Sequence, residues 1–508
     1  MKRNVVVILC DQLRRDFLSC YGFAALQTTN IDALAAQGVR FDGATTASPV
    51  CAPARASMMT GRYVSDHGVW TNDVPFRDGI DFLPQRMNAA GYRTGAFGKL
   101  HHFPGRDGKG FSVCKLMEEN RLNEADDYFQ WLKEKHPEIE NVFPHLENGD
   151  FAFSRQEYYE QWIADNAIGF VKENAEHPFF AWVSFQGPHT PMDPPHDVSV
   201  ALDEDKIPAA KAVRFRSGCE VPDYRGVANY GGMSDAARAD YRVRYCKMIG
   251  EIDRQIGRLV QTLKAAGVYE NTTILFSADH GDMCGDYGMM QKGPMPYAAQ
   301  FEVPMILANC PNVVQGSESS MPVSNLDIGA TCLSIAGDEA PFGVSRPLHK
   351  MLAGTVPPHK AVFAEFCDSI KLLDTARYRF AYYPFTGQSQ LFDKTLPDYE
   401  LHNLANDPAH AVLKATLLME LMDYTILAKG ARIEAQDFVP KVQEGLREKM
   451  PNFAAELPLV FPLQTEAHRE RLRKEGYNAD YNEFCKEHEI LRHYGAYWLP
   501  KGVEKHQD

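Results

Sequence analysis

Short continuous apolar runs recur along this chain, and each is followed by polar residues. Residues 5–10 and 178–185 are apolar almost throughout. Such runs are typical of strands buried on both faces of a parallel sheet. Weaker runs predict further strands over residues 91–98, 272–277 and 303–308. The pattern therefore predicts an α/β fold built on a mostly parallel sheet.

Segments of helical periodicity separate these runs and would flank the sheet. Residues 30–38 predict a short helix with an asparagine cap and a terminal glycine. Another helix is expected to begin at Cys51. A long helix is predicted over residues 241–266, where apolar residues stand at helical spacing: Met248, Ile249, Ile252, Ile256, Leu259, Val260 and Leu263.

The pattern changes after about residue 355, where short strands separated by turn residues predict a small antiparallel sheet. These strands cover residues 361–366, 378–383 and 390–393, and a helix follows over residues 412–427. The extension at the end of the chain is expected to pack on the body or on a neighbouring subunit. The predicted domains are a catalytic domain over residues 1–355, a small antiparallel-sheet domain over residues 356–435 and the extension over residues 436–508.

Composition narrows the class of protein. The chain has 508 residues and a formal net charge of -14, which argues against nucleic acid as a partner. Its eleven cysteines include no CxxC pair, as expected in a reducing compartment. The apolar run at residues 5–9 is too short for a signal peptide, and no stretch reaches the length of a transmembrane helix. We therefore expect a cytoplasmic protein that does not associate with membranes.

Polar residues with metal-binding or acid–base chemistry follow four of the predicted strands. In an open α/β sheet, ligands bind at the carboxyl ends of the strands, so these residues are expected to share one site. Carboxylate and amide oxygens with one imidazole suit a hard divalent ion; each carboxylate alone would fit a helix cap better, and it is their joint pattern that favours a metal. The strand ends are Asp11 with Gln12, Lys99 with His101, His189, and Asp279 with His280.

Cationic side chains in the same predicted loops favour an anionic substrate. If Arg55, Lys99 and Lys292 converge, they would hold a tetrahedral oxyanion and stabilise its transition state. His101 and His189 could transfer protons near neutral pH. The alternative is that these cations are exposed and solvated, and that His189 is a turn residue between two prolines.

A cysteine stands at the predicted start of a helix, in Ser48-Pro49-Val50-Cys51-Ala52-Pro53-Ala54-Arg55. Ser48 is a candidate cap, and the helix N-terminus would favour an anion beside the thiol. The alternative is a small buried core cysteine. The residues around Cys51 decide between these interpretations.

The phrase Cys51-Ala52-Pro53-Ala54-Arg55, followed by Thr60-Gly61-Arg62, closely resembles the signature of the type I, formylglycine-dependent sulfatases of the alkaline phosphatase superfamily. The resemblance runs in order over about residues 4–410. It implies an alkaline-phosphatase-like mixed, mostly parallel sheet flanked by helices, with a smaller C-terminal α+β domain. Further matches are Gly98-Lys99-Leu100-His101, His189-Thr190-Pro191, Asp279-His280-Gly281, Lys292 and Leu401 to Pro408.

The resemblance implies a role for each residue. Cys51 would be oxidised to formylglycine, whose hydrate attacks sulfur while Arg55 stabilises it. His189 and Lys292 would assist the leaving ester oxygen, and His101 would take a proton from the second hydroxyl so that sulfate is released. The implied substrate-binding residues are Asn72, Lys99, His189 and Lys292, and the implied metal ligands are Asp11, Gln12, Cys51, Asp279 and His280.

The metal pairs differ from the Asp-Asp and Asp-Asn of many sulfatases. They resemble the branch near phosphonate monoester hydrolases and choline-sulfatase-like enzymes, to which Asn72 also points. The implied metal is Ca²⁺, with Mn²⁺ as the alternative. Lys99 and His101 stand where phosphonate hydrolases carry neutral residues, which favours a sulfate ester over a phosphodiester.

Three hypotheses follow. The first is a sulfuric ester hydrolase for a small-molecule or saccharide sulfate, activated by a formylglycine-generating or sulfatase-maturating enzyme. The second is a phosphonate monoester or phosphodiester hydrolase, and the third is a metal-binding scaffold in which Cys51 remains a thiol. The organic part of the substrate would be selected by the predicted insertion at residues 115–160 and the predicted loop at 190–235. The tail allows a dimer or a tetramer.

Overall fold

The computed structural model describes residues 2–144, 149–212, 234–367, 369–384 and 386–428. Within these residues an eight-stranded sheet forms the centre of the molecule, in the order β5-β4-β6-β1-β7-β8-β2-β9. β8 runs antiparallel to β7 and β2, and every other pairing is parallel. The strands are β1 (Asn4–Cys10), β2 (Gly38–Phe41), β4 (Arg93–Gly98), β5 (Val113–Leu116), β6 (Phe179–Phe185), β7 (Thr272–Ala278), β8 (Met305–Ala308) and β9 (Ser317–Ser319).

The central strands are those with the longest apolar runs. Every residue of β1, β6 and β7 is buried, because helices cover both faces of the sheet at these strands. This burial explains why their sequences show no alternation of polar and apolar positions. The mixed, mostly parallel sheet confirms the predicted fold class.

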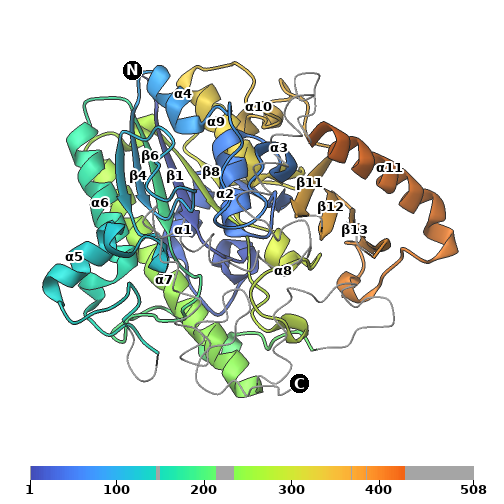
Figure 1. Cartoon of the computed structure of the whole chain (residues 1–508), viewed down its shortest axis with the longest axis horizontal. Helices are drawn as coiled ribbons and strands as arrows, with labels where there is room; N and C mark the ends of the chain where they lie inside the picture. Colours follow the sequence, from blue (N-terminus) through green and yellow to red (C-terminus); the bar gives the residue numbers. More distant parts are fainter. Residues whose placement is uncertain (1, 145–148, 213–233, 368, 385, 429–508) are drawn as a thin grey trace.

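Two groups of helices flank the sheet (Figure 1). α6 and α1 both pack against α7, and α2 and α4 both pack against α9. The first group is α1 (Thr29–Ala36), α5 (Asp127–Lys135), α6 (Tyr159–Asn174) and α7 (Asp235–Ala265); the second is α2 (Cys51–Thr60), α3 (Val64–His67), α4 (Leu83–Ala89), α9 (Ile328–Ala336) and α10 (Leu348–Leu352). None of the described helices is long and apolar enough to cross a membrane.

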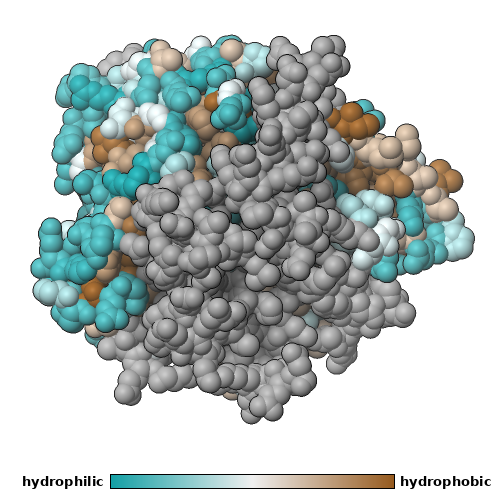
Figure 2. Space-filling model, viewed as in Figure 1, coloured by the Kyte–Doolittle hydropathy of each residue, from teal (hydrophilic) through white to brown (hydrophobic). Residues whose placement is uncertain are grey.

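A smaller antiparallel sheet of four described strands, in the order β11-β12-β13-β14, lies beside the main body. It carries α11 (Ala411–Ala428) (Figure 1). Figure 2 shows apolar residues along the edge where α11 lies, and Val412 and Ile426 are its most exposed large apolar residues. The strands are β11 (Ala361–Phe366), β12 (Ile370–Thr375), β13 (Tyr378–Tyr383) and β14 (Gln388–Asp393).

Several predicted boundaries need correction. α1 ends at Ala36, because Gly38 begins β2, and its N-cap position is Thr28. α7 begins six positions earlier than predicted, at Asp235, where the Ser234 hydroxyl accepts from the Ala237 N–H. Residues 115–160 are not a simple insertion, because they contain the end of β5, all of α5 and the start of α6. The predicted extension at residues 436–508 and residues 213–233 of the predicted loop lie outside the described residues.

Shorter elements complete the fold: β3 (Ala44–Thr45), β10 (Val323–Ser324) and α8 (Ala298–Phe301).

Candidate active site

The carboxyl ends of β1 and β7 deliver the two predicted metal pairs. The strands pair in register with Cys10 beside Ala278, so Asp11 and Asp279 follow at neighbouring positions. The Gln12 N–H donates to Asp279 Oδ1 at 2.9 Å, from a residue with a φ of 65°. This left-handed turn at Gln12 ends the strand and keeps both carboxylates at the same edge of the sheet.

Cys51 occupies the first position of α2, and all ten residues of that helix are buried. The N-cap is Val50, which makes no side-chain cap, and the Ser48 hydroxyl has no hydrogen-bond partner among the described residues. The prediction that Ser48 caps this helix is therefore wrong. The N-terminus of α2 still places positive potential beside Cys51.

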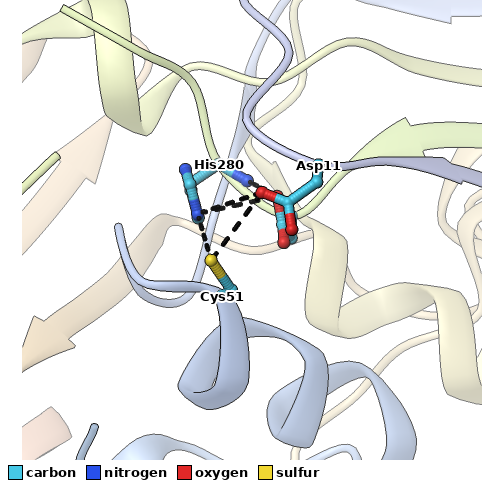
Figure 3. A group of neighbouring side chains, drawn as sticks. Asp11, Cys51 and His280 are labelled. Atoms are coloured by element: carbon cyan, nitrogen blue, oxygen red, sulfur yellow. Dashed lines mark hydrogen bonds and ion pairs between the residues drawn. The ribbon is translucent and has the colours of Figure 1, made fainter. Parts of the chain in front are cut away.

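Four side chains form one compact donor set, of which Figure 3 labels Asp11, Cys51 and His280. A ligand atom from each of Asp11, Cys51, Asp279 and His280 lies within 4.8 Å of the others, and all four residues are buried. Cys51 Sγ is 3.2 Å from His280 Nε2 and 3.7 Å from Asp11 Oδ1. Two carboxylates and an imidazole, directed at one point, match the ligands that a hard divalent ion takes.

His280 has the protonation state of a neutral metal ligand. Its Nδ1 lies 2.9 Å from the Gly281 carbonyl, so Nδ1 carries the proton and Nε2 directs a lone pair at the cluster. Burial lowers the pKa of His280 to about 4, although the nearby carboxylates act in the opposite direction.

Arg55 bridges the two carboxylates of the donor set. Its Nε is 2.8 Å from Asp279 Oδ2 and its Nη2 is 3.2 Å from Asp11 Oδ2. The remaining nitrogen donates to the Lys99 carbonyl at 2.6 Å and to the Ser184 hydroxyl at 2.7 Å. The rigid fork of the guanidinium therefore fixes the strand ends of β1, β4, β6 and β7 relative to one another.

Lys292 lies directly beside Cys51. Its Nζ is 2.8 Å from Cys51 Sγ and 2.8 Å from Gln12 Oε1. The predicted ligand Gln12 therefore directs its oxygen at Lys292, while its amide nitrogen contacts Asp282. Gln12 stays close to the donor set but serves as the partner of Lys292.

Lys99 is buried between two carboxylates. Its Nζ is 2.6 Å from Asp11 Oδ2 and also contacts Glu119. Burial alone would raise the pKa of Asp11, but Lys99 and the other cations of the site outweigh burial and hold it well below its usual value. Burial would lower the pKa of Lys99, and its two carboxylate partners raise it instead. Both groups are charged at neutral pH.

The remaining predicted residues surround this centre. His101 is buried, and its Nε2 lies 2.6 Å from Arg121. His189 is held by a 2.6 Å contact from its Nδ1 to the Thr190 carbonyl, and that nitrogen is 3.7 Å from Glu119. Asn72 accepts from the Ala52 N–H at 3.2 Å, at the start of α2. The structure thus brings every predicted site residue into one network.

Three further residues of this network, which lie just after β5, were not predicted from the sequence. Glu118, Glu119 and Arg121 follow the strand, and the last two belong to the 3₁₀ helix Glu119–Arg121. Glu119 accepts from Lys99 and from Gln186, and Arg121 binds both glutamates. The local sequence gives little signal for these residues, because Lys115 interrupts the short run that precedes them.

A protein-family model described as Sulfatase matches residues 3–338 of this chain. The chain belongs to the sulfatase family. An arylsulfatase of Clostridium perfringens is 28% identical over 468 residues, which cover 83% of this chain and 95% of that protein. A choline-sulfatase of Rhizobium meliloti is 28% identical over 458 residues, covering 82% and 85% of the two chains.

Among solved structures, a phosphonate monoester hydrolase of Agrobacterium radiobacter has the same fold, with a TM-score of 0.73 and 25% sequence identity. The match covers 84% of this sulfatase-family chain and 96% of that structure. These comparisons confirm the predicted superfamily, the alkaline-phosphatase-like fold and the enzyme class, a hydrolase of sulfuric esters. The individual roles of the site residues stay predictions.

Proposed function

We propose that this sulfatase cleaves a sulfate monoester to an alcohol and inorganic sulfate, with a formylglycine formed from Cys51 as the nucleophile. The observation that carries the proposal is the position of Cys51. Its side chain lies at the N-terminus of a buried helix, between the ammonium of Lys292 and the donor atoms of Asp11 and His280. A structural core cysteine has no need of these neighbours.

Each residue of the site is assigned a separate role in sulfate transfer. Arg55, Lys99 and Lys292 supply fixed positive charge where negative charge develops in the transition state. The proton on His189 Nδ1 is held by the Thr190 carbonyl, which orients the ring. We assign His189 and Lys292 to the leaving ester oxygen. Asn72, through its contact with the N-terminus of α2, is assigned to the transferred group.

A divalent cation fits the donor set of Asp11, Asp279, His280 and the side chain at position 51. The two buried carboxylates supply the negative charge that such an ion requires, and His280 supplies a neutral nitrogen. When bound, the ion provides Lewis-acid activation and neutralises charge on the anionic ester. Oxygen-rich ligands favour Ca²⁺ in this proposal, with Mn²⁺ as the alternative.

The mass of the tryptic peptide spanning residues 41–55, from protein made in its native host, tests the nucleophile. An aldehyde in place of the thiol is the expected result, and Cys51→Ala should abolish turnover of an aryl sulfate. A peptide that carries only intact cysteine in an active enzyme would contradict the proposal.

A phosphonate monoester or phosphodiester hydrolase is the second candidate, because a phosphonate monoester hydrolase shares this fold. Lys99 and His101 favour the sulfate ester. Comparing kcat/KM for an aryl sulfate and an aryl phosphonate separates the two, and a strong preference for the phosphonate would favour the alternative.

We also propose that the enzyme is cytoplasmic and is modified there by a formylglycine-generating or sulfatase-maturating enzyme. All nine cysteines within the described residues are free thiols, which suits a reducing compartment. Cell fractionation tests the location. A small-molecule or saccharide sulfate as substrate, and a dimer or tetramer as the assembly, stay predictions.

A further inference from the structure

The side chain of Gln12 is held at both ends of its amide. The amide nitrogen donates to Oδ2 of Asp282, and the amide oxygen accepts from Nζ of Lys292 at 2.8 Å. A carboxylate only accepts hydrogen bonds and an ammonium only donates them, so both partners require the same orientation of the amide. Nζ of Lys292 is also 2.8 Å from Cys51 Sγ. Gln12 therefore directs an oxygen at the cation that lies beside position 51.

The carboxylate of Asp282 is surrounded by donors. The backbone N–H groups of Cys284 and Gln291 donate to its Oδ1 at 2.6 and 3.0 Å. The hydroxyl of Tyr241 donates at 2.7 Å to Oδ2, the oxygen that also accepts from Gln12. An ionised carboxylate has acceptor sites for all four donors. Because two of the donors are main-chain groups, the position that faces them must remain an oxygen.

The main chain of Gln12 is fixed as well. The hydroxyl of Tyr245, one turn after Tyr241 on α7, donates to the Gln12 carbonyl at 2.6 Å. The Gln12 N–H donates to Asp279 Oδ1 at 2.9 Å. All these residues are buried, as is Asp282. If the amide turned over, its oxygen would face the Asp282 carboxylate and its NH₂ group would face an ammonium, and unmatched polar groups are costly where water is excluded.

We propose that Asp282 is a positioning residue that sets the Gln12 amide with its oxygen toward position 51 and so holds the ammonium of Lys292 there. The same oxygen would face a divalent ion bound at the donor set, because a hard cation at this point takes oxygen ligands. Hydrogen-bond partners of this kind orient the groups around a metal and tune its affinity. The inference rests on the proposed function only for the presence of that ion.

Exchanging the amide and the carboxylate between positions 12 and 282 tests this role. In Asp282→Asn the two main-chain donors retain the oxygen of the new amide, so its NH₂ group faces Gln12. The Gln12 amide would then turn over and direct its own NH₂ group at Lys292. Adding Gln12→Glu restores an acceptor at both contacts, whereas Gln12→Glu alone sets two carboxylates against each other. The two substitutions should therefore compensate for one another.

Urea unfolding of the full chain, freed of metal by a chelator, measures this compensation without turnover. We expect the unfolding midpoint to fall in Asp282→Asn and in Gln12→Glu, and to recover in the variant that combines them. Tyr241→Phe is the matched control, because it removes a hydrogen bond from the same carboxylate oxygen but leaves an acceptor in front of Gln12. Adding Gln12→Glu to this control should bring no recovery. If the losses of Asp282→Asn and Gln12→Glu simply added in the combined variant, the proposal would be overturned.

Equilibrium dialysis against Ca²⁺ and against Mn²⁺ measures the consequence for a bound ion. Asp282→Asn should weaken binding about 10–100-fold, as when the partner of a metal ligand is lost, and the combined variant should regain most of that affinity. Unchanged affinity in Asp282→Asn would overturn the proposal. If the unmodified chain bound neither ion, the proposed metal site would be wrong, and the unfolding midpoints would still decide whether Asp282 sets the orientation of Gln12.

Discussion

At the scale of single residues, the site gathers opposite charges in a volume from which water is excluded. Three cations face the two carboxylates of the donor set, and Glu119 at the edge of the site pairs with one of the cations, Lys99. Charges interact more strongly there than in water, because the effective dielectric constant is lower. An anionic ester is therefore attracted to this point, even though the whole chain carries a net charge of -14. The five charged side chains are all buried: Asp11, Asp279, Arg55, Lys99 and Lys292.

Lys99→Met should lower kcat for an aryl sulfate by about 10²–10³-fold, because it removes a fixed charge that stabilises the transition state. Metal binding should survive, since both carboxylates of the donor set remain. Metal content measured by mass spectrometry, together with steady-state kinetics, checks both parts. Lys133→Met, which removes an ion pair at the surface, is the control. Near-normal turnover in Lys99→Met would show that the lysine is not part of the catalytic site.

His67 should make stability depend on pH. Its Nδ1 accepts from the Val69 N–H at 3.1 Å, so Nε2 carries the proton and donates to Ser57 Oγ at 3.0 Å. Burial lowers its pKa to about 3 in the folded state, from an ordinary value of 6.5. The unfolded chain therefore binds the proton first, and stability is lost as the pH falls from 6.5 toward 3.

The contribution of His67 is at most about 1.4 kcal/mol for each pH unit. Urea unfolding of the unmodified chain and of His67→Gln, from pH 7 downward, measures it as the difference between two slopes. We expect the free energy of unfolding to fall less steeply with acidification in the variant. Parallel curves would mean that His67 is protonated in the folded protein, against its two hydrogen bonds.

At the scale of elements, the strands that could be predicted are those whose own residues are mostly apolar. β1 and β6 are apolar along most of their length and β7 has an apolar centre, so their ends could be placed at one edge of the sheet from sequence alone. β12 was missed because Lys371 and Asp374 look polar in sequence. Both are buried, and their partners Glu365 and Arg379 lie on neighbouring strands.

The network around Arg121 was not predicted either, because its members also lie on different strands. Its partners, His101 and Glu118, become adjacent only when β4 and β5 pair, and that pairing cannot be deduced from local periodicity. The positions of Cys51, Arg55 and the strand-end ligands were predictable because a short motif and a general property of α/β sheets agree about them. The centre of the site could thus be predicted from local motifs, whereas its surroundings depend on strand pairing between distant segments.

Arg379 of β13 joins the small sheet to the main body, and its removal should destabilise the protein. Its Nη2 lies 2.9 Å from Asp374 on β12 and 2.8 Å from Glu302, which follows α8. Arg379→Met would remove the buried cation that Asp374 and Glu302 share and leave them only Lys394 and Arg15, at a cost of up to about 3–5 kcal/mol. Arg377→Met, two residues away and exposed, breaks a surface pair with Asp393 and should change stability little. Urea unfolding compares the two, and equal effects would contradict this role for Arg379.

At the scale of the whole molecule, β1, β7 and α2 meet at the donor set, so a bound ion would connect elements that are far apart in sequence. Removal of metal with a chelator should therefore lower the melting temperature as well as abolish turnover. An ion present at 100 times its dissociation constant stabilises the folded state by about 2.7 kcal/mol, which readdition of Ca²⁺ or Mn²⁺ should restore.

The variant Asp279→Asn separates this effect from other actions of the chelator. It removes one carboxylate of the donor set while the side chain keeps its size, so the melting temperature should respond much less to chelation or to added metal. The ion that raises the melting temperature of the unmodified chain at the lower concentration is the one the site prefers. If chelation changed the melting temperature equally in both proteins, the stabilising ion would bind elsewhere, and the donor set around Cys51 would not be the metal site.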